Sequence, residues 1–213
     1  MHGRDTLTIA RLIAVGVFTA EVVVLAVSGL WLIFFYAPSQ AQAWPGFSNL
    51  DTSAGAVGFV RALHRVAAFI AVPSALVAGV LVVVDSRVRR PGWRQGGLAL
   101  GAGPGLVVVT LAAWFTGYLL PWDQLALFAV TVGTNMSGYG SLFGSSVKFA
   151  LVGGTEVTTS TLLRWFLVHT VVLSVLLAGA LFVAWRPRRR EVSQADAVGE
   201  TGGTGTTSAS WVG

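Results

Sequence analysis

The sequence predicts an all-α integral membrane protein built as a four-helix bundle. Charged residues make up only 11% of the 213 residues and hydrophobic residues 54%, whereas soluble domains average about 25% charged residues. Four apolar stretches each reach the length of about 20 residues that a helix needs to cross a bilayer. The chain has no cysteine, which excludes a disulfide-stapled secreted scaffold.

The predicted spans are the segments between charged clusters. The first covers residues 12–36, with Glu21 as its only charge, and the second covers residues 57–84. The third lies within residues 95–122 and the fourth within residues 165–185. Each segment is long enough to cross the membrane once, so four helices are the simplest count.

The distribution of arginine predicts the topology. Arginines cluster before the first span, between the second and third spans, and after the fourth. By the positive-inside rule, both termini and the middle loop are cytoplasmic. We expect residues 1–10 to form a cytoplasmic N-terminal segment, residues 11–187 the transmembrane domain, and residues 188–213, rich in Gly, Thr and Ser, a disordered cytoplasmic tail. Topology thus accounts for the net charge of +5 without a nucleic-acid partner.

The first span has a competing interpretation as a cleaved signal peptide, because Ala41-Gln42-Ala43 has the small residues of a cleavage site. The apolar core of a signal peptide has about 7 to 15 residues. The first span is longer and contains Glu21. A retained helix is therefore the favoured interpretation.

Two intramembrane histidines are candidate ligands of a metal cofactor. His64 and His169 lie about 11 Å and about 13 Å from the outer ends of the second and fourth spans, at 1.5 Å per residue. Two imidazoles at matched depth on facing helices suit the axial positions of one b-type haem. The alternative is that each histidine is a polar residue hydrogen-bonded to a neighbouring helix. The matched depth favours haem.

An arginine precedes each histidine on its outward side. Arg61 and Arg164 are candidate partners of haem propionates, because a guanidinium matches the geometry of a carboxylate. The alternative is anchoring at the membrane interface, which is the role we expect for Arg65.

Glycines on the first and third spans would let a flat ring approach a helix backbone. The residues concerned are Gly29, Gly103 and Gly117. Glycine is also common in membrane helices for packing reasons, so this pattern alone does not distinguish the two uses.

Three stretches of the chain resemble the N-terminal, haem-bearing half of cytochrome b from quinol oxidoreductases, and are closest to its photosynthetic branch, where this half is a separate chain. They are SGLWLIFFYAPSQAQAW with FVRALHRVAA (28–44 and 59–68), GYLLPWDQ (117–124) and TLLRWFLVHTVVL (161–173). With the four-span layout, the resemblance covers about residues 10–187.

The resemblance implies a role for each matching residue. His64 and His169 would bind the haem nearer the outer surface, and Arg164 matches the family's arginine ahead of its histidine. Arg61 would be a propionate partner, and Gly29 and Gly117 would flank the ring. Residues 122–143 resemble the family's surface helix at the outer quinol-oxidation pocket, and we expect a short interfacial helix there.

The chain also departs from the family, which normally carries a second histidine about fourteen residues further along each ligand helix, about 21 Å away on the same face. Here those positions are Ala78 and Val183, and Ala184 follows. We therefore expect one bis-His haem b and no complete Q-cycle. The family's later helices are not in this sequence, so a quinol pocket would need a partner, such as a C-terminal cytochrome b-like subunit or an iron–sulfur protein.

The expected function is that of a single-haem b-type cytochrome subunit of a membrane oxidoreductase, an electron-transfer component rather than a complete enzyme. It would carry electrons between quinol or quinone and a redox partner on the outer face. An alternative is a degenerate cytochrome b that serves as a non-redox anchor or assembly subunit. A transporter has little support, because only Glu21 lies deep enough to line a pathway. Glu21 could relay protons, bind quinone or simply bond to a neighbouring helix.

Overall fold

The computed structural model describes residues 2–52, 55–89, 93–135 and 158–186. Helices are the only regular elements within these ranges. Four of them are long and apolar enough to cross a membrane: Thr6–Ile33, Ala56–Val88, Leu100–Leu119 and Thr159–Trp185. The predicted all-α, multi-pass membrane architecture is confirmed.

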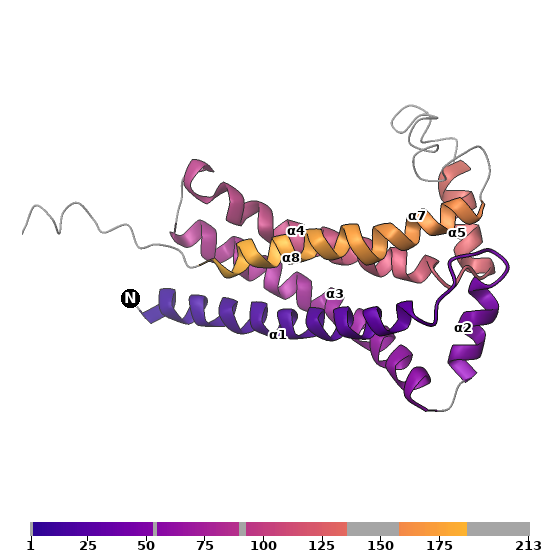
Figure 1. Ribbon diagram of the computed structural model, residues 1–213. Helices are drawn as coiled ribbons and strands as arrows, with labels where there is room; N and C mark the ends of the chain where they lie inside the picture. Colours follow the sequence, from indigo (N-terminus) through magenta and orange to yellow (C-terminus); the bar gives the residue numbers. More distant parts are fainter. Residues whose placement is uncertain (1, 53–54, 90–92, 136–157, 187–213) are drawn as a thin grey trace, which may run out of the picture.

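The long helices lie side by side and form the bundle (Figure 1). They are α1 (His2–Ile33), α3 (Ala56–Arg89), α4 (Trp93–Leu119), and α7 (Thr159–Leu167), which continues through the π-helical turn η2 (Val168–Val172) into α8 (Leu173–Trp185). Helix α1 begins at His2, so the expected N-terminal segment continues the helix of the first span. The expected tail lies outside the described residues.

Helix α3 packs against both α1 and α4, while α4 also packs against α8. Large apolar side chains cover the outside of the bundle. Leu30, Val108 and Val175 are 63%, 64% and 66% exposed, respectively. Surfaces of this kind are stable against lipid tails rather than against water, as expected of membrane helices.

Two short helices, α2 (Ala43–Thr52) and α5 (Gln124–Asn135), sit at one end of the bundle, opposite the N-terminus (Figure 1). We call this the outer end and the opposite one the inner end. Helix α5 lies where the interfacial helix was predicted, although residues 136–143 of that prediction lie outside the described part. Helix α2 was not anticipated from the sequence, where its residues fall in the loop that follows the first predicted span.

The Pro-Trp-Asp-Gln stretch forms the turn between α4 and α5. Trp122 has a left-handed backbone, with φ of 54°, and its side chain is buried. The Asp123 carboxylate accepts a 2.7 Å hydrogen bond from the amide of Ala126 and so caps the first turn of α5. This motif therefore fixes the angle at which the interfacial helix leaves the bundle.

Candidate functional site

The two predicted histidines lie on different helices in the outer half of the bundle. His64 is on α3, and His169 is in the π-helical turn η2. Both side chains are half-buried. A π-helical turn inside an α-helix often marks a functional site, and here it contains a candidate ligand.

A buried hydroxyl fixes the tautomer of His64. Nδ1 of His64 lies 2.8 Å from Oγ of Ser28 on α1, and this Oγ donates its hydrogen to the carbonyl oxygen of Val24 at 2.6 Å. Because a hydroxyl has a single hydrogen, Ser28 must accept the bond from Nδ1–H. The lone pair of Nε2 is then free to coordinate a metal.

The same arrangement recurs at His169. Its Nδ1 lies 3.0 Å from Oγ1 of Thr116 on α4, and this hydroxyl bonds to the carbonyl oxygen of Ala112 at 2.8 Å. Both histidines are therefore held with Nε2 unprotonated. Sequence reasoning missed the two hydroxyls, although a signal was present: Ser28 and Thr116 each immediately precede one of the glycines singled out above.

Those two glycines let the imidazoles approach a neighbouring backbone. A Cβ atom at Gly29 would lie 3.1 Å from Cε1 of His64. At Gly117 it would lie 2.9 Å from Cε1 of His169, which is closer than real Cβ contacts allow. The third candidate, Gly103, has a different neighbour, because its Cβ would lie 2.6 Å from the carbonyl oxygen of Gly79. In this structure Gly103 serves the contact between α3 and α4.

The two candidate propionate partners differ in their surroundings. Arg61 on α3 donates from Nη1 to the carbonyl oxygen of Phe47 at 3.3 Å, and its guanidinium carbon lies 4.5 Å from the centre of the Phe47 ring. Arg61 is thus held beneath the short helix α2. Arg164, by contrast, is exposed on α7.

An apolar cluster that includes Leu119 and Leu162 lies at the outer end of the bundle. Four aromatic side chains pack against it, namely Tyr36, Phe47, Trp165 and Phe166. The cluster therefore joins α2 and α7 to the rest of the fold. The Tyr36 hydroxyl donates to the carbonyl oxygen of Leu120 at 2.8 Å, and burial raises the pKa of this phenol.

One donor beside this cluster lacks an acceptor among the described residues. The indole nitrogen Nε1 of Trp165 is buried and makes no hydrogen bond to that part of the chain. Sequence analysis did not single out Trp165. An unpaired buried N–H is uncommon in native proteins and points to a missing acceptor at this end of the bundle.

The donor set suits the metal of a macrocycle better than a bare ion. Within the described ranges, no group of three or more His, Cys, Asp or Glu side chains could hold a metal ion. Two imidazoles alone would leave a bare ion short of ligands, whereas a porphyrin iron needs only two axial ligands from the protein. The free Nε2 atoms of His64 and His169 therefore fit a haem.

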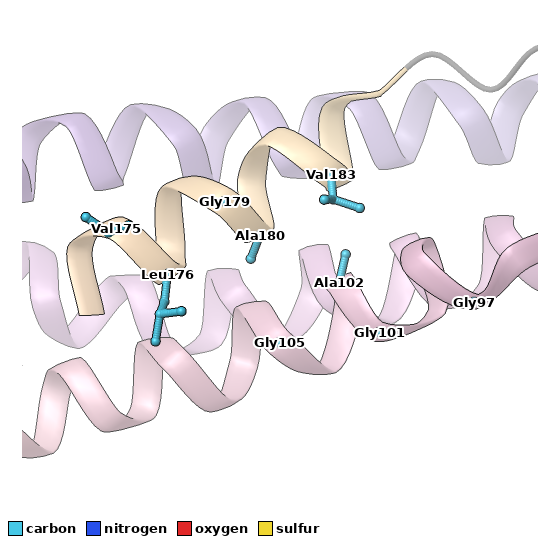
Figure 2. Close-up of a pocket in the computed structure, with 9 residues that line it drawn as sticks. All are labelled: Gly97, Gly101, Ala102, Gly105, Val175, Leu176, Gly179, Ala180 and Val183. Carbon is cyan, nitrogen blue, oxygen red and sulfur yellow. The ribbon is translucent and has the colours of Figure 1, made fainter. Parts of the chain in front are cut away.

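The inner half of the bundle is filled differently. Ala78 and Ala184 are fully buried in one apolar cluster with Phe18 and Leu106. Val183, the position expected from a regular helix, instead lines an apolar groove of about 460 Å³ that opens between α4 and α8 (Figure 2). The π-helical turn adds one residue to the repeat, so Ala184, rather than Val183, shares a cluster with Ala78.

Polar groups at the inner end are paired with one another. Nε of Arg11 lies 3.1 Å from Oδ2 of Asp85, and both side chains are nearly inaccessible, at 5% and 1% exposure. Although this Nε–H is not aligned for a hydrogen bond, Nη1 of Arg11 donates to the carbonyl oxygen of Ala184 at 2.7 Å. Three helices, α1, α3 and α8, are thereby tied together.

Two more side chains complete the inner half. The indole of Trp185 lies 3.8 Å from the Cβ position of Gly16, and its Nε1 donates to Oγ1 of Thr19 at 2.9 Å. Between the two halves, Ser74 donates to Oε1 of Glu21 at 2.9 Å. The predicted intramembrane acid is thus hydrogen-bonded to a neighbouring helix.

Comparison with known proteins gives concordant matches. A family model for the cytochrome b (N-terminal)/b6/petB domain matches residues 93–197. The menaquinol:cytochrome c reductase cytochrome b subunit of Geobacillus thermodenitrificans is 29% identical over 173 residues, covering 79% of this chain and 74% of that protein. Cytochrome b6 of Gracilaria tenuistipitata var. liui is 32% identical over 162 residues, covering 76% and 73%.

Among solved structures, a chain of a hyperthermophilic respiratory Complex III has the same fold, with a TM-score of 0.65 and 21% sequence identity. The match covers 85% of this chain but only 46% of that one. The present sequence therefore spans less than half the length of that relative.

Proposed function

The chain belongs to the cytochrome b family, and on this basis we propose that it is a single-haem b-type cytochrome subunit that carries electrons between quinol or quinone and a redox partner on the outer face of the membrane. The observation that carries the proposal is the pair of Nε2 atoms of His64 and His169, each left free by a hydroxyl bonded to Nδ1. The names of the menaquinol:cytochrome c reductase relatives support the quinol assignment.

The bound haem supplies a one-electron iron couple. His64 and His169 would hold the haem, and Ser28 and Thr116 fix the tautomer and orientation of their imidazoles. Gly29 and Gly117 give those rings room against the neighbouring helices. Such fixed ligands favour electron transfer, since little has to move when the charge on the iron changes.

The propionate assignments rest on position and charge. Arg61 lies one helical turn outward of His64, at the level where propionates on the outer edge of the haem would lie, and its guanidinium can pair with a carboxylate. Arg164 lies on α7, ahead of His169 in the sequence, and would act as the second cationic partner. We assign Arg61 the closer contact, because Phe47 already holds its side chain within the fold.

Three features support a single haem. Ala78, one of the two positions where the family normally carries a second histidine, is buried in a packed apolar cluster together with Ala184, which follows the other position, Val183. Next to Ala78, the backbone of Gly79 on α3 lies against that of Gly103 on α4. The indole of Trp185 lies against Gly16. These contacts between side chains and between helices support the proposal of a single haem.

The proposed topology follows from the positive-inside rule, with both termini in the cytoplasm and the haem near the opposite face. One haem cannot relay electrons across the whole bilayer, so the donor and acceptor would both act near the outer face. A partner subunit, either an iron–sulfur protein or a C-terminal cytochrome b-like subunit, would complete the quinol pocket beside α5.

The test is the ratio of haem to protein in the full chain purified from membranes of cells supplied with haem, measured as the pyridine haemochrome. One haem per chain, with a b-type α band in the reduced-minus-oxidised spectrum, is expected. Two haems per chain would refute the single-haem assignment. Folded protein without haem would favour the alternative of a non-redox anchor or assembly subunit.

A further inference from the structure

Within the ranges that the structure describes, the buried indole nitrogen of Trp165 is a hydrogen-bond donor without an acceptor. An indole N–H can only donate, so no rearrangement of its own hydrogens can satisfy it. A phenylalanine at this position would supply similar apolar surface without leaving a buried donor unpaired. The presence of tryptophan therefore indicates that an acceptor arrives with a ligand.

The position of Trp165 narrows the identity of that ligand. Trp165 precedes His169 by about one helical turn and lies on the same side of the helix, nearer the outer end. On α3, Arg61 stands in the same relation to His64. A donor and a cation thus lie one turn outward of the two imidazoles, on opposite sides of the proposed haem.

The other aromatic residues packed against the apolar cluster at the outer end do not supply an acceptor for Trp165. The Tyr36 hydroxyl donates to the carbonyl oxygen of Leu120, while Phe47 and Phe166 offer only apolar surface. Haem, in contrast, carries two propionate carboxylates at one edge. A hydrogen bond from a neutral N–H to a carboxylate is stronger than one to a neutral carbonyl, especially where water is excluded.

We propose that Trp165 donates a hydrogen bond from Nε1 to a propionate carboxylate of the bound haem. This inference rests on the proposed haem between His64 and His169. It makes Trp165 a cofactor-binding residue that favours the reduced state. The N–H offsets part of the carboxylate's negative charge, and that charge otherwise stabilises the ferric iron.

The experiment compares the full-length wild type with W165F, purified without added quinone. In an optical redox titration we expect W165F to have a lower midpoint potential, by up to about 59 mV, which is a tenfold change for a one-electron couple. W185F is the matched control, because Nε1 of Trp185 already donates to Oγ1 of Thr19 in the inner half. Its potential should equal that of the wild type.

A second measurement reports the hydrogen bond directly and needs no titration. Ultraviolet resonance Raman spectra of the indole N–H are recorded for wild type and W165F, with haem bound and after haem extraction. The difference between the two proteins isolates Trp165 among the eight tryptophans. We expect a hydrogen-bonded indole in the haem-bound protein and a free one in the haem-free protein.

The outcomes separate this inference from the proposed function. A wild type that binds haem, with an unchanged potential in W165F and an indole signal that does not depend on haem, would overturn the inference alone. So would an indole shift that appears only on addition of a quinone analogue, since the acceptor would then be a quinone carbonyl. A wild type that never binds haem would overturn the proposed function as well.

Discussion

The outer and inner halves of the bundle are built from the same helices, yet glycine has a different role in each half. On α4, Gly117 faces the imidazole of His169, whereas Gly103 meets the backbone of Gly79 on α3. In the outer half, glycine makes room for a side chain that can bind a ligand. In the inner half, it brings two helices into direct contact. A glycine therefore provides space, and the neighbouring helix determines what fills it.

The polar groups of the two halves differ in the same way. At the inner end, Arg11 lies against Asp85 and donates to a carbonyl oxygen at the end of α8. At the outer end, hydroxyls orient two imidazoles while leaving Nε2 of each free, and Nε1 of Trp165 finds no acceptor among the described residues. The inner charges are thus held within the protein, whereas the outer groups fit the ligand that we propose.

The largest effect should come from the histidines of the outer half. Replacing either His64 or His169 with alanine would remove one of the two proposed haem ligands, so we expect complete loss of bound haem. The measurement is the haem content and the reduced α band of the purified variant. Glu21→Gln is the control and should retain haem, because Glu21 bonds to Ser74 rather than to the ligand pair. Haem retained in both histidine variants would contradict the assignment.

Substitutions in the inner half should lower the stability of the fold rather than prevent haem binding. Asp85→Ala leaves Arg11 as an uncompensated buried charge, and we expect a loss of about 3–5 kcal/mol in the free energy of unfolding. Unfolding in mixed detergent micelles measures this change. The double variant Arg11→Met, Asp85→Leu should be much less destabilised, since neither charge remains. The folded fraction of each variant should still bind haem. Loss of haem from folded protein would show that the two halves are coupled.

The glycines of α4 allow a sharper comparison. Gly117→Ala would place a Cβ 2.9 Å from Cε1 of His169, so the ring must move, at a cost of about 1–3 kcal/mol. We expect weaker haem binding, measured by haem titration. Gly105→Ala is the matched control, because a Cβ there meets nothing within 4 Å, and it should bind haem normally. Equal effects of the two substitutions would argue against the contact.

The smallest predicted effect concerns the hydroxyl that orients His169. Thr116→Val removes the acceptor for Nδ1–H, and loss of such a supporting partner costs about tenfold or more in metal affinity. The matched control is Thr110→Val on the same helix. Thr110 is also buried, and its hydroxyl bonds to the carbonyl oxygen of Leu106. Haem titration should separate the two variants, and equal affinities would mean that the bond to Nδ1 does not support the ligand.

Several features were predictable because they depend on local properties of the chain. Length and hydropathy located the four spans, and the matched depth of His64 and His169 placed both in the outer half. The interfacial helix α5 was also anticipated, from the apolar run after Asp123. These signals depend on the order of residues along one segment, which the sequence gives directly.

Other features were missed because they depend on contacts between helices. Ser28 and Thr116 become important only when their helices bring each hydroxyl against an imidazole. Likewise, Trp165 stands out only because the folded chain buries its Nε1 without supplying an acceptor. Neither property can be read from a single helix.

The amino-acid sequence by itself determined that this protein crosses the membrane four times and carries one pair of histidines at matching depth. Hydrophobic length and residue spacing are properties of each helix alone. Only the tertiary structure decided that Gly103 holds α3 against α4, and that Ala184, shifted by the turn at 168–172, packs with Ala78. The rotation and register of each helix depend on how its surface packs against its neighbours, and that packing exists only once the bundle has formed.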